Sequence, residues 1–505
     1  MTFLAIVTAA LLGLIVYDLL QRRHAILRNF PIIGHFRYLL ESVGPELRQY
    51  LVTGNDEERP FSRDQRSWVY ASSKREQNYF GFGTDNELED RANYLIVKHE
   101  TLGPAESTPI HAPDPPDRLP CAKVLGGQRG RPCAFRPESL VNISGMSFGS
   151  LSGPAVEALN RGAALAGCLH NAGEGGVNSY HRHGGDLIFQ IGTGYFGCRD
   201  ARGRFELDLL KEVVASNPVR AIEIKLSQGA KPGVGGFLPG VKVTAEIAAA
   251  RGIPIRQDCA SPPAHGAFGG VDELLDFVER VADATGLPVG IKSAVGELDF
   301  WHELVRLMEK GDRGVDFITI DGGEGGTGAG PLVFADHVAL PYKLGMSRVY
   351  RCFAERGLQN HVVFVGSGKL GFPETALLAL ALGCDMINVG REAMLAMGCL
   401  QAQRCHTGRC PTGITTHSRW LVRGLDPGLK SVRVANYIST LRFELLRLAH
   451  ACGRAHPALV PLERLEILDG RFDGSAAHEV FKYEPGWGLP SPEERAELER
   501  LMLAS

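Results

Sequence analysis

Three cysteines near position 400 have a spacing that suggests metal chemistry. Cys399, Cys405 and Cys410 stand as C-x5-C-x4-C-P in the segment GCLQAQRCHTGRCPTG. Structural zinc sites normally take four protein ligands, and only His406 and His417 lie nearby, without zinc-finger spacing. Thiolates in a loop that contains cysteine and proline are typical iron–sulfur ligands, and three of them suit a cluster that lacks one corner iron. The spacing favours an iron–sulfur cluster over zinc or free thiols.

Glycine-rich loops form a second group of candidate binding residues. The segments Gly322–Gly328, Gly366–Lys369 and Gly390–Arg391 each follow an apolar, strand-like run. Successive backbone N–H groups in such loops can cradle a phosphate. A lone loop of this kind is more often a tight turn, but three at consecutive strand ends favour a phosphate-bearing cofactor. These glycine-rich loops resemble the Rossmann G-x-G-x-x-G fingerprint only weakly, so we do not expect NAD(P)H to bind here.

The elements that must position these loops begin near residue 141. Short apolar runs there alternate with segments of helical period, such as Val271, Leu274, Leu275, Val278 and Val281, which is typical of repeated βα units. Eight parallel strands would close into a (β/α)8 TIM barrel with its chemistry on the loops after the strands. An open, doubly wound sheet is the alternative. Nine runs compete for eight places, so we expect one to lie outside the barrel: Val141–Ser144, Cys168–Asn171, Leu187–Ile191, Ala221–Lys225, Ile253–Gln257, Pro288–Lys292, Phe317–Ile320, Val362–Val365 and Met386–Val389.

The N-terminus carries a candidate membrane anchor. Residues 3–17 (FLAIVTAALLGLIVY) are uncharged, and Arg22, Arg23 and Arg28 follow. The apolar segment is near the lower limit for crossing a bilayer, which takes about 20 residues. A signal peptide would have its basic residues before the apolar run, and a buried helix is the other alternative. By the positive-inside rule, we expect a single-pass protein whose catalytic body faces the cytoplasm.

Composition supports a globular enzyme in a reducing compartment. The 505 residues carry a net charge of -3 without long Lys or Arg blocks, so nucleic acid is not an expected partner. The 11 cysteines are odd in number and mostly scattered, unlike a disulfide scaffold. We expect an anchor at 1–24, a small α/β cap ending in the proline-rich linker APDPPDRLP at 25–120, the barrel at 121–420 and a helical C-terminal extension at 421–505.

The cysteine segment resembles the 3Fe-4S loop of the glutamate synthase large subunit. The segments ISGMSFGSLS, NAGEGGVNSY, IKLSQGAKPGVGG, ASPPAHG and GGEGGTGAGP also resemble that family and follow its order between residues 142 and 415. The layout is similar to shorter FMN-binding glutamate synthase-like proteins with a leading membrane segment. The resemblance implies FMN in the barrel and a 3Fe-4S cluster on Cys399, Cys405 and Cys410.

The resemblance also implies roles for individual residues. Reduced flavin needs nearby positive charge, and a dicarboxylate substrate needs cations for its carboxylates. Lys231 and Lys292 suit the first role, whereas Lys225 and Arg251 suit the second, although ordinary salt bridges remain possible for Lys231 and Arg251. The expected catalytic residues are Lys225, Lys231 and Arg251. The expected FMN-binding residues are Met146, Ser147, Gln228, Lys231, Lys292, Gly325, Gly326, Thr327, Gly366, Gly368, Gly390 and Arg391.

The reaction implied is reductive amination of 2-oxoglutarate with ammonia to glutamate, with electrons from a ferredoxin-like or separate flavoprotein donor. The chain has no cysteine before Cys121, so the N-terminal cysteine nucleophile of a glutaminase domain is not expected here. Val234 and Phe237 replace Glu and Gln of the family's KPG-E-GG-Q stretch, and Asp321 and Glu324 replace Ser and Asp of another loop. An unpaired hydrogen-bonding group costs about 1–3 kcal/mol, enough to change specificity.

These departures keep three other functions open. The first is transfer of an amine other than ammonia to or from glutamate. The second is an FMN-dependent 2-hydroxy-acid oxidase, which would not need the cysteine loop. The third is a membrane-bound electron-transfer or sensory flavoprotein that does not turn over a keto acid.

Overall fold

The computed structural model describes residues 2–21, 24–52, 54–79, 81–102 and 118–503 and contains two compact units, residues 1–65 and 66–505. Arg22, Arg23 and most of the predicted proline-rich linker lie outside the described residues. The predicted domain boundaries remain predictions.

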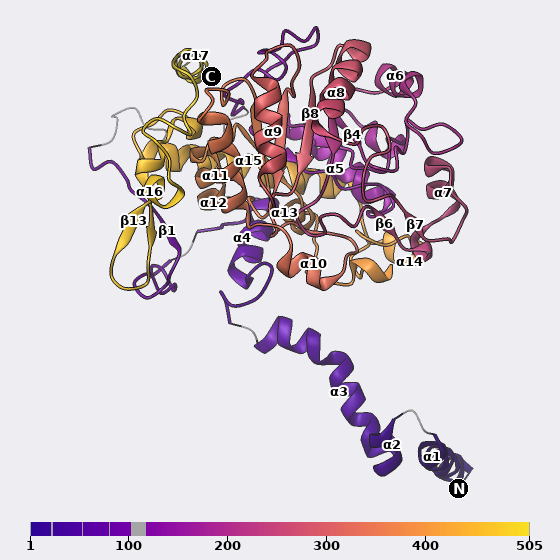
Figure 1. Ribbon diagram of the computed structural model, residues 1–505. Coiled ribbons are helices and arrows are strands. Elements are labelled where there is room, and N and C mark those ends of the chain that lie inside the picture. Colours follow the sequence, from indigo (N-terminus) through magenta and orange to yellow (C-terminus); the bar gives the residue numbers. More distant parts are fainter. Residues whose placement is uncertain (1, 22–23, 53, 80, 103–117, 504–505) are drawn as a thin grey trace. The chain divides into compact units, whose positions relative to one another are not determined.

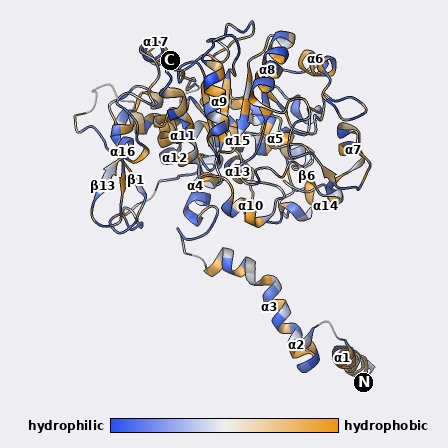
Figure 2. Ribbon diagram, viewed as in Figure 1, coloured by the Kyte–Doolittle hydropathy of each residue, from blue (hydrophilic) through white to orange (hydrophobic). Residues whose placement is uncertain are grey.

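The first unit is helical. It contains α1 (Thr2–Leu20), α2 (Ala25–Asn29), α3 (Ile33–Leu47) and the π-helical turn η1 (Arg48–Val52). Helix α1 is long and apolar enough to cross a membrane by length and composition, and nearly all of its side chains are exposed. A signal sequence would pass the same test. Figure 2 shows the apolar character of α1 and the alternation of hydrophobic and hydrophilic residues along α3. The helix α4 (Arg63–Lys74) contains the boundary to the second unit.

The second unit is built on a closed barrel of eight parallel strands, which confirms the predicted TIM barrel. The strand order around the barrel is β10-β11-β2-β3-β4-β5-β8-β9. Most of these strand residues are buried, because helices cover the outside and side chains fill the inside. The barrel strands are β2 (Val141–Ile143), β3 (His170–Asn171), β4 (Leu187–Ile191), β5 (Val219–Lys225), β8 (Val289–Ser293), β9 (Phe317–Asp321), β10 (Val363–Ser367) and β11 (Met386–Val389).

One of the nine candidate runs lies outside the barrel, as predicted: Ile253–Gln257 is a loop with a turn and not a strand. It follows α7 (Ala245–Arg251) and leads into β7 (Cys259–Ala260), which pairs with β6 (Phe237–Leu238) in a two-stranded sheet outside the barrel. Pro254 removes a backbone donor from this run, which disfavours a central strand. The β6–β7 pair belongs to a long excursion between β5 and β8.

Helices surround the barrel (Figure 1). The predicted amphipathic helix at 271–281 is part of α8, whose apolar residues are buried. Helix α15 packs along α5 and also contacts α12. Besides α4 and α7, the described part of this unit contains the helices α5 (Gly153–Ala166), α6 (Leu207–Ser216), α8 (Val271–Thr285), α9 (Asp299–Met308), α10 (Leu332–His337), α11 (Tyr342–Ala354), α12 (Pro373–Ala381), α13 (Arg391–Ala396), α14 (Arg419–Val422), α15 (Pro427–Ala451), α16 (Ala477–Phe481) and α17 (Pro492–Leu503). Its short 3-10 turns are η2 (Ser179–His181), η3 (Gly240–Lys242), η4 (Cys405–Thr407), η5 (Pro457–Leu459) and η6 (Leu462–Arg464).

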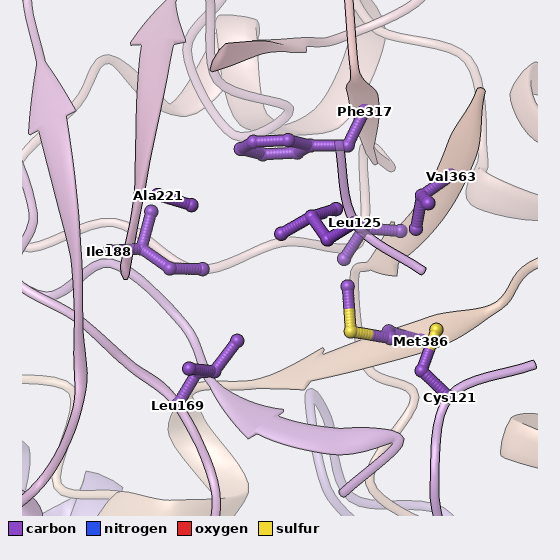
Figure 3. Packing of buried hydrophobic residues seen from close by; sticks show 9 residues of the cluster. Cys121, Leu125, Leu169, Ile188, Ala221, Phe317, Val363 and Met386 are labelled. Atoms are coloured by element: carbon purple, nitrogen blue, oxygen red, sulfur yellow. The ribbon is translucent and has the colours of Figure 1, made fainter. Parts of the chain in front are cut away.

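The segment before β2 closes the amino-terminal end of the barrel. Cys121 and Leu125 belong to a buried apolar cluster with side chains from the barrel strands, among them Phe317 and Met386 (Figure 3). Lys123 is buried beside them and donates to Asp385 at 3.1 Å. With this end filled by side chains, the opposite end is left for a ligand.

The C-terminal extension is joined to the barrel unit by a small sheet and by apolar packing. Strand β12 (Leu465–Leu468) pairs antiparallel with β13 (Gly474–Ala476) and with β1 (Tyr94–Val97). Strand β1, from the predicted N-terminal cap, therefore shares a sheet with the extension. Leu498 of α17 packs with residues of the barrel-closing segment and of η5.

Candidate functional site

A cavity of about 180 Å³ opens at the carboxyl ends of the barrel strands. The strand-end residues Ser144, Ser367 and Asn388 reach it, and so do the loops that follow β5 and β9. This is the end of a TIM barrel at which ligands bind. The predicted site residues that line this cavity are Met146, Ser147, Lys225, Gln228, Lys231, Lys292, Gly325, Gly326, Thr327, Gly368, Gly390, Arg391 and Cys405.

Four predicted site residues do not line this cavity. Gly366 is buried in β10, where a Cβ would lie 2.6 Å from the hydroxyl of Tyr342. Cys399 and Cys410 lie in the cysteine loop outside the cavity wall. Arg251 lies behind the loop that follows β2 and donates to the carbonyl oxygen of Phe148 at 3.0 Å.

Arg251 occupies a buried position with one group unpaired. Its guanidinium lies 4.9 Å from the centre of the Phe196 ring, and its Nη2 lies 3.5 Å from Ser147 Oγ. Its Nε is buried without a hydrogen-bond partner among the described residues. The side chain supports the loop that carries Met146 and Ser147, and any contact with a substrate carboxylate would require the guanidinium to reach past that loop.

A chain of polar contacts links the loops after β3, β5 and β9. Lys225 Nζ, at the end of β5, lies 3.2 Å from Glu174 Oε2 and donates to Gln228 Oε1 at 3.0 Å. The amide nitrogen of Gln228 donates to the carbonyl oxygen of Gly326 at 2.7 Å. Burial raises the pKa of Glu174, but the charges of Lys225 and Lys231 outweigh it, so that pKa is lowered overall. Glu174 is therefore anionic at neutral pH and holds Lys225 at the cavity wall.

Two further cations face the cavity, Lys231 from the loop after β5 and Lys292 from β8. Lys231 is almost fully buried, and burial lowers the pKa of its ammonium group while Glu174 partly restores it. Lys292, on β8, lies 3.7 Å from the carboxylate of Asp321, which also accepts the backbone N–H of Gly229 at 2.8 Å. Buried cations of this kind stabilise negative charge on a bound group more strongly than exposed ones do.

Phe237 faces the same space. It is 44% exposed and lines the cavity from β6. A smaller adjoining pocket is formed by Glu174, Thr193, Lys225 and neighbouring loop residues. Thr193 is buried, and within the part of the chain that the structure describes its hydroxyl has no hydrogen-bond partner. An aromatic ring where the resembling family has an amide makes this part of the site more apolar.

The glycine positions at the cavity fit a flat ring system with a phosphate. A Cβ on Gly390 would point toward Ser144 and Met146, with nearest atoms at 3.6 and 3.9 Å, so this glycine keeps the cavity wall low. At Gly229 a Cβ would collide with the backbone of Gly322, so the loops after β5 and β9 touch there. FMN is an anionic cofactor with a planar ring, and its chemistry fits the glycine backbone together with Lys231, Lys292 and Arg391.

The cysteine loop provides donors suited to thiolate ligands. Gln401 donates its backbone N–H to Cys399 Sγ at 3.4 Å, and the Thr412 hydroxyl lies 3.4 Å from Cys410 Sγ. Burial raises the pKa of the Cys410 thiol, but hydrogen bonds from Thr412 and Thr415 outweigh it and lower that pKa. Burial lowers the pKa of Lys242 to about 8, although the negative charges of Cys405 and Cys410 act to raise it.

These donors fit an iron–sulfur cluster by their chemistry, since hydrogen bonds to sulfur and burial tune such clusters. Within the residues that the structure describes, no three His, Cys, Asp or Glu side chains form a metal-binding group as they stand. Cys405 lines the main cavity, whereas the other two cysteines lie beyond it.

Several cavity residues were not predicted from the sequence. Glu174 stands in the segment NAGEGG, and an acidic residue between glycines after a strand is a signal that could have identified it. Gln190 and Asn388 are polar residues one position before the ends of the apolar strands β4 and β11, which also marks a ligand-facing position. Gln190 donates to the buried Glu223 at 2.6 Å, so its orientation is fixed from inside the barrel.

Comparison with known proteins agrees with this arrangement. Residues 131–455 match the conserved region in glutamate synthase. The chain is 37% identical over 484 residues to the glutamate synthase large subunit-like protein YerD of Bacillus subtilis, covering 90% of this chain and 91% of that protein. The chain belongs to the glutamate synthase family. It is therefore an oxidoreductase of the glutamate synthase-like type.

A second glutamate synthase relative matches a smaller part of this chain. The Archaeal glutamate synthase (NADPH) of Methanocaldococcus jannaschii is 36% identical over 314 residues, which is 62% of this chain and 59% of that protein. The chain thus spans about 59% of the length of that relative. Among solved structures, a mutant flavocytochrome b2 with benzoylformate aligns at 14% identity with a TM-score of 0.45, over 90% of this chain and 91% of that one.

Proposed function

We propose that this glutamate synthase family member binds FMN at the barrel mouth and forms glutamate from 2-oxoglutarate and ammonia. The balance of the reaction takes up two electrons and two protons and releases water. The observation that carries the proposal is the chain of contacts from Glu174 through Lys225 and Gln228 to Gly326, which joins cations to a glycine-lined cavity. Bound FMN would supply hydride transfer to the carbon that receives the amine.

The residues of the chain have separate roles in this proposal. Lys231 and Lys292 hold the negative charge of the reduced cofactor. Lys225 binds a carboxylate of the keto acid, and Glu174 keeps the Lys225 ammonium group oriented. Arg391, with the glycines at positions 368 and 390, holds the phosphate. Arg251 supports the loop that carries Met146 and Ser147 and assists a carboxylate only if that loop moves.

We further propose that Cys399, Cys405 and Cys410 hold a 3Fe-4S cluster, which when bound would supply electron transfer from a ferredoxin-like or separate flavoprotein donor. The hydrogen bonds to the Cys399 and Cys410 sulfur atoms support this proposal, and so does Lys242 close by. Helix α1 would anchor the protein as a single-pass membrane protein with its catalytic unit in the cytoplasm. The length and apolar composition of α1 support that anchor.

A steady-state assay tests the proposed reaction. The purified full chain, supplied with reduced methyl viologen, 2-oxoglutarate and ammonium, should form glutamate at a rate that depends on both substrates. Omission of ammonium should stop product formation. A protein with intact FMN that forms no glutamate under these conditions would contradict the proposal.

Phe237 favours one alternative substrate, an amine more apolar than ammonia. The ring lines the cavity where the resembling family has a glutamine, so it could contact an alkyl group. A panel of alkylamines with 2-oxoglutarate would distinguish the two reactions. If the alternative holds, Phe237→Gln should lower the preference for alkylamines over ammonium, and if ammonium is the substrate, the wild-type protein should show no such preference.

A further inference from the structure

Helix α3 carries an apolar stripe that faces solvent in the first unit. Ile33, Phe36, Leu40, Val43 and Leu47 recur at intervals of three and four residues, which places them on one side of the helix. Their exposed fractions lie between 40% and 76%. Figure 2 shows these hydrophobic positions alternating with hydrophilic ones along α3. A stripe this regular and this exposed needs an apolar environment.

The opposite side of α3 is polar. Glu41 and Ser42 are exposed there, and exposed Arg37 flanks the stripe. The helix therefore has one face suited to hydrocarbon and one suited to water. Amphipathic helices of this kind lie in the plane of a membrane interface, with the apolar face at the boundary between headgroups and acyl chains.

A buried carboxylate fixes the start of α3 to the end of α1. Asp18 is completely buried, accepts the backbone N–H of Ile32 at 3.0 Å, and lies 2.9 Å from His35 Nε2. The rings of His24 and Tyr38 add an edge-to-face contact at 5.1 Å. The first turns of α3 are thus held at the C-terminal end of the apolar helix α1.

We propose that α3 lies on the cytoplasmic membrane surface, with its apolar stripe inserted in the lipid interface. The inference rests on the proposed anchor: if α1 crosses the bilayer, the Asp18 contacts place the start of α3 at the level where that crossing ends. Exposed Arg28, between the two helices, suits the anionic headgroups of that leaflet.

A second copy of α3 is a less favoured occupant of the stripe than lipid. The helix has 15 residues, about two heptads, whereas a coiled coil is indicated by three to four heptads. The Asp18 contacts, which hold the start of α3 at the end of the apolar helix α1, also favour lipid.

Depth-dependent fluorescence quenching tests the proposal on the full chain. The protein is reconstituted in vesicles of phosphatidylcholine and phosphatidylglycerol, with and without brominated acyl chains, and each added tryptophan is measured against the parent protein. Phe36→Trp reports the stripe, Glu41→Trp is the matched control on the polar face, and Val7→Trp reports α1. We expect brominated lipid to quench Phe36→Trp several-fold more than Glu41→Trp.

The three variants separate failure of the inference from failure of the anchor. Quenching of Val7→Trp with equal, weak quenching of Phe36→Trp and Glu41→Trp would overturn the interfacial position of α3 and leave the anchor standing. Phe36→Trp that is protected from aqueous iodide but not quenched by lipid would place the stripe against protein and also overturn it. Quenching of Phe36→Trp without quenching of Val7→Trp would support the interfacial helix and argue against the membrane span.

Discussion

Lys225 illustrates how a single side chain joins the structure of the barrel to its proposed chemistry. Its backbone ends β5, and its ammonium group contacts Glu174 and Gln228, which belong to two different loops. The contact with Glu174 keeps the charge in place before a substrate arrives, so little reorganisation is needed on binding. Lys225 is therefore the residue whose removal should affect turnover most without affecting the fold.

Replacement of this lysine tests that role. Lys225→Met should retain FMN and lower the rate of glutamate formation by about 100-fold or more, the effect typical of removing one preorganised electrostatic contact. Lys211→Met is the matched control, because Lys211 is exposed on α6 and pairs only with Asp208 among the ion pairs found in the described residues. Equal activity in the two variants would show that Lys225 does not bind substrate.

The cysteine loop allows a prediction that does not depend on catalysis. Cys405→Ser should abolish bound iron and leave the flavin absorbance unchanged, since Cys405 supplies one proposed ligand and the glycine loops remain. Cys133→Ser, at an exposed cysteine far from the loop in sequence, should keep the iron. Iron analysis and low-temperature electron paramagnetic resonance measure the bound iron in both variants. Full iron retention in Cys405→Ser would rule out the proposed cluster.

The elements position the site through close contacts between loops. The loop after β5 touches the loop after β9 at Gly229, where a side chain would meet the backbone of Gly322. A methyl group there must push these loops apart and break the bond between Gly229 N–H and Asp321. Because that bond and the contact of Lys292 with Asp321 share one carboxylate, the distortion reaches the cavity wall.

Gly229→Ala should therefore weaken FMN binding by at least about tenfold, equivalent to about 1.4 kcal/mol. Gly296→Ala is the control, since it lies in the loop after the neighbouring strand β8 and a Cβ there meets no atom within 4 Å. Flavin titration of the two apoproteins measures the difference. Similar dissociation constants would mean that this loop contact does not shape the cofactor site.

The sequence predicts the barrel well because buried parallel strands are short apolar runs bounded by glycine and polar residues. It fails at Ile253–Gln257, whose apolar composition resembles a strand although Pro254 and the neighbouring turn prevent barrel pairing. The glycine loops also identify the side of the barrel that holds the cavity. Sequence spacing does not reveal which positions face the cavity, so Glu174 was missed, while the roles of Gly366 and Arg251, which do not line the cavity, stay predictions.

The C-terminal extension contributes to the stability of the barrel unit through a buried histidine. His456 lies 3.1 Å from the carbonyl oxygen of Pro120 through Nε2, and its Nδ1 accepts the N–H of Ala458. Burial lowers the pKa of His456 to about 3. The folded protein keeps this ring neutral, whereas the unfolded chain takes up a proton near pH 6.5. The stability due to this difference is complete above pH 6.5 and is lost as the pH falls from 6.5 toward 3.

His456→Gln should therefore reduce the acid sensitivity of unfolding. The variant should lose less stability than the wild type between pH 7 and 4, and the difference should be of the order of a few kcal/mol, since one unit of pKa corresponds to about 1.4 kcal/mol. Urea unfolding at several pH values, followed by circular dichroism, measures it. Parallel curves for the two proteins would show that His456 does not titrate on unfolding.

A single anaerobic turnover tests the central claim, that the protein transfers reducing equivalents to a keto acid bound in the cavity at the barrel mouth. The purified protein, with its flavin photoreduced, is mixed with 2-oxoglutarate and ammonium, and reoxidation is followed by absorbance. The account predicts rapid reoxidation with one glutamate formed per flavin, and much slower reoxidation in Lys225→Met. Flavin that stays reduced in the wild-type protein, with its iron and FMN intact, would contradict the account.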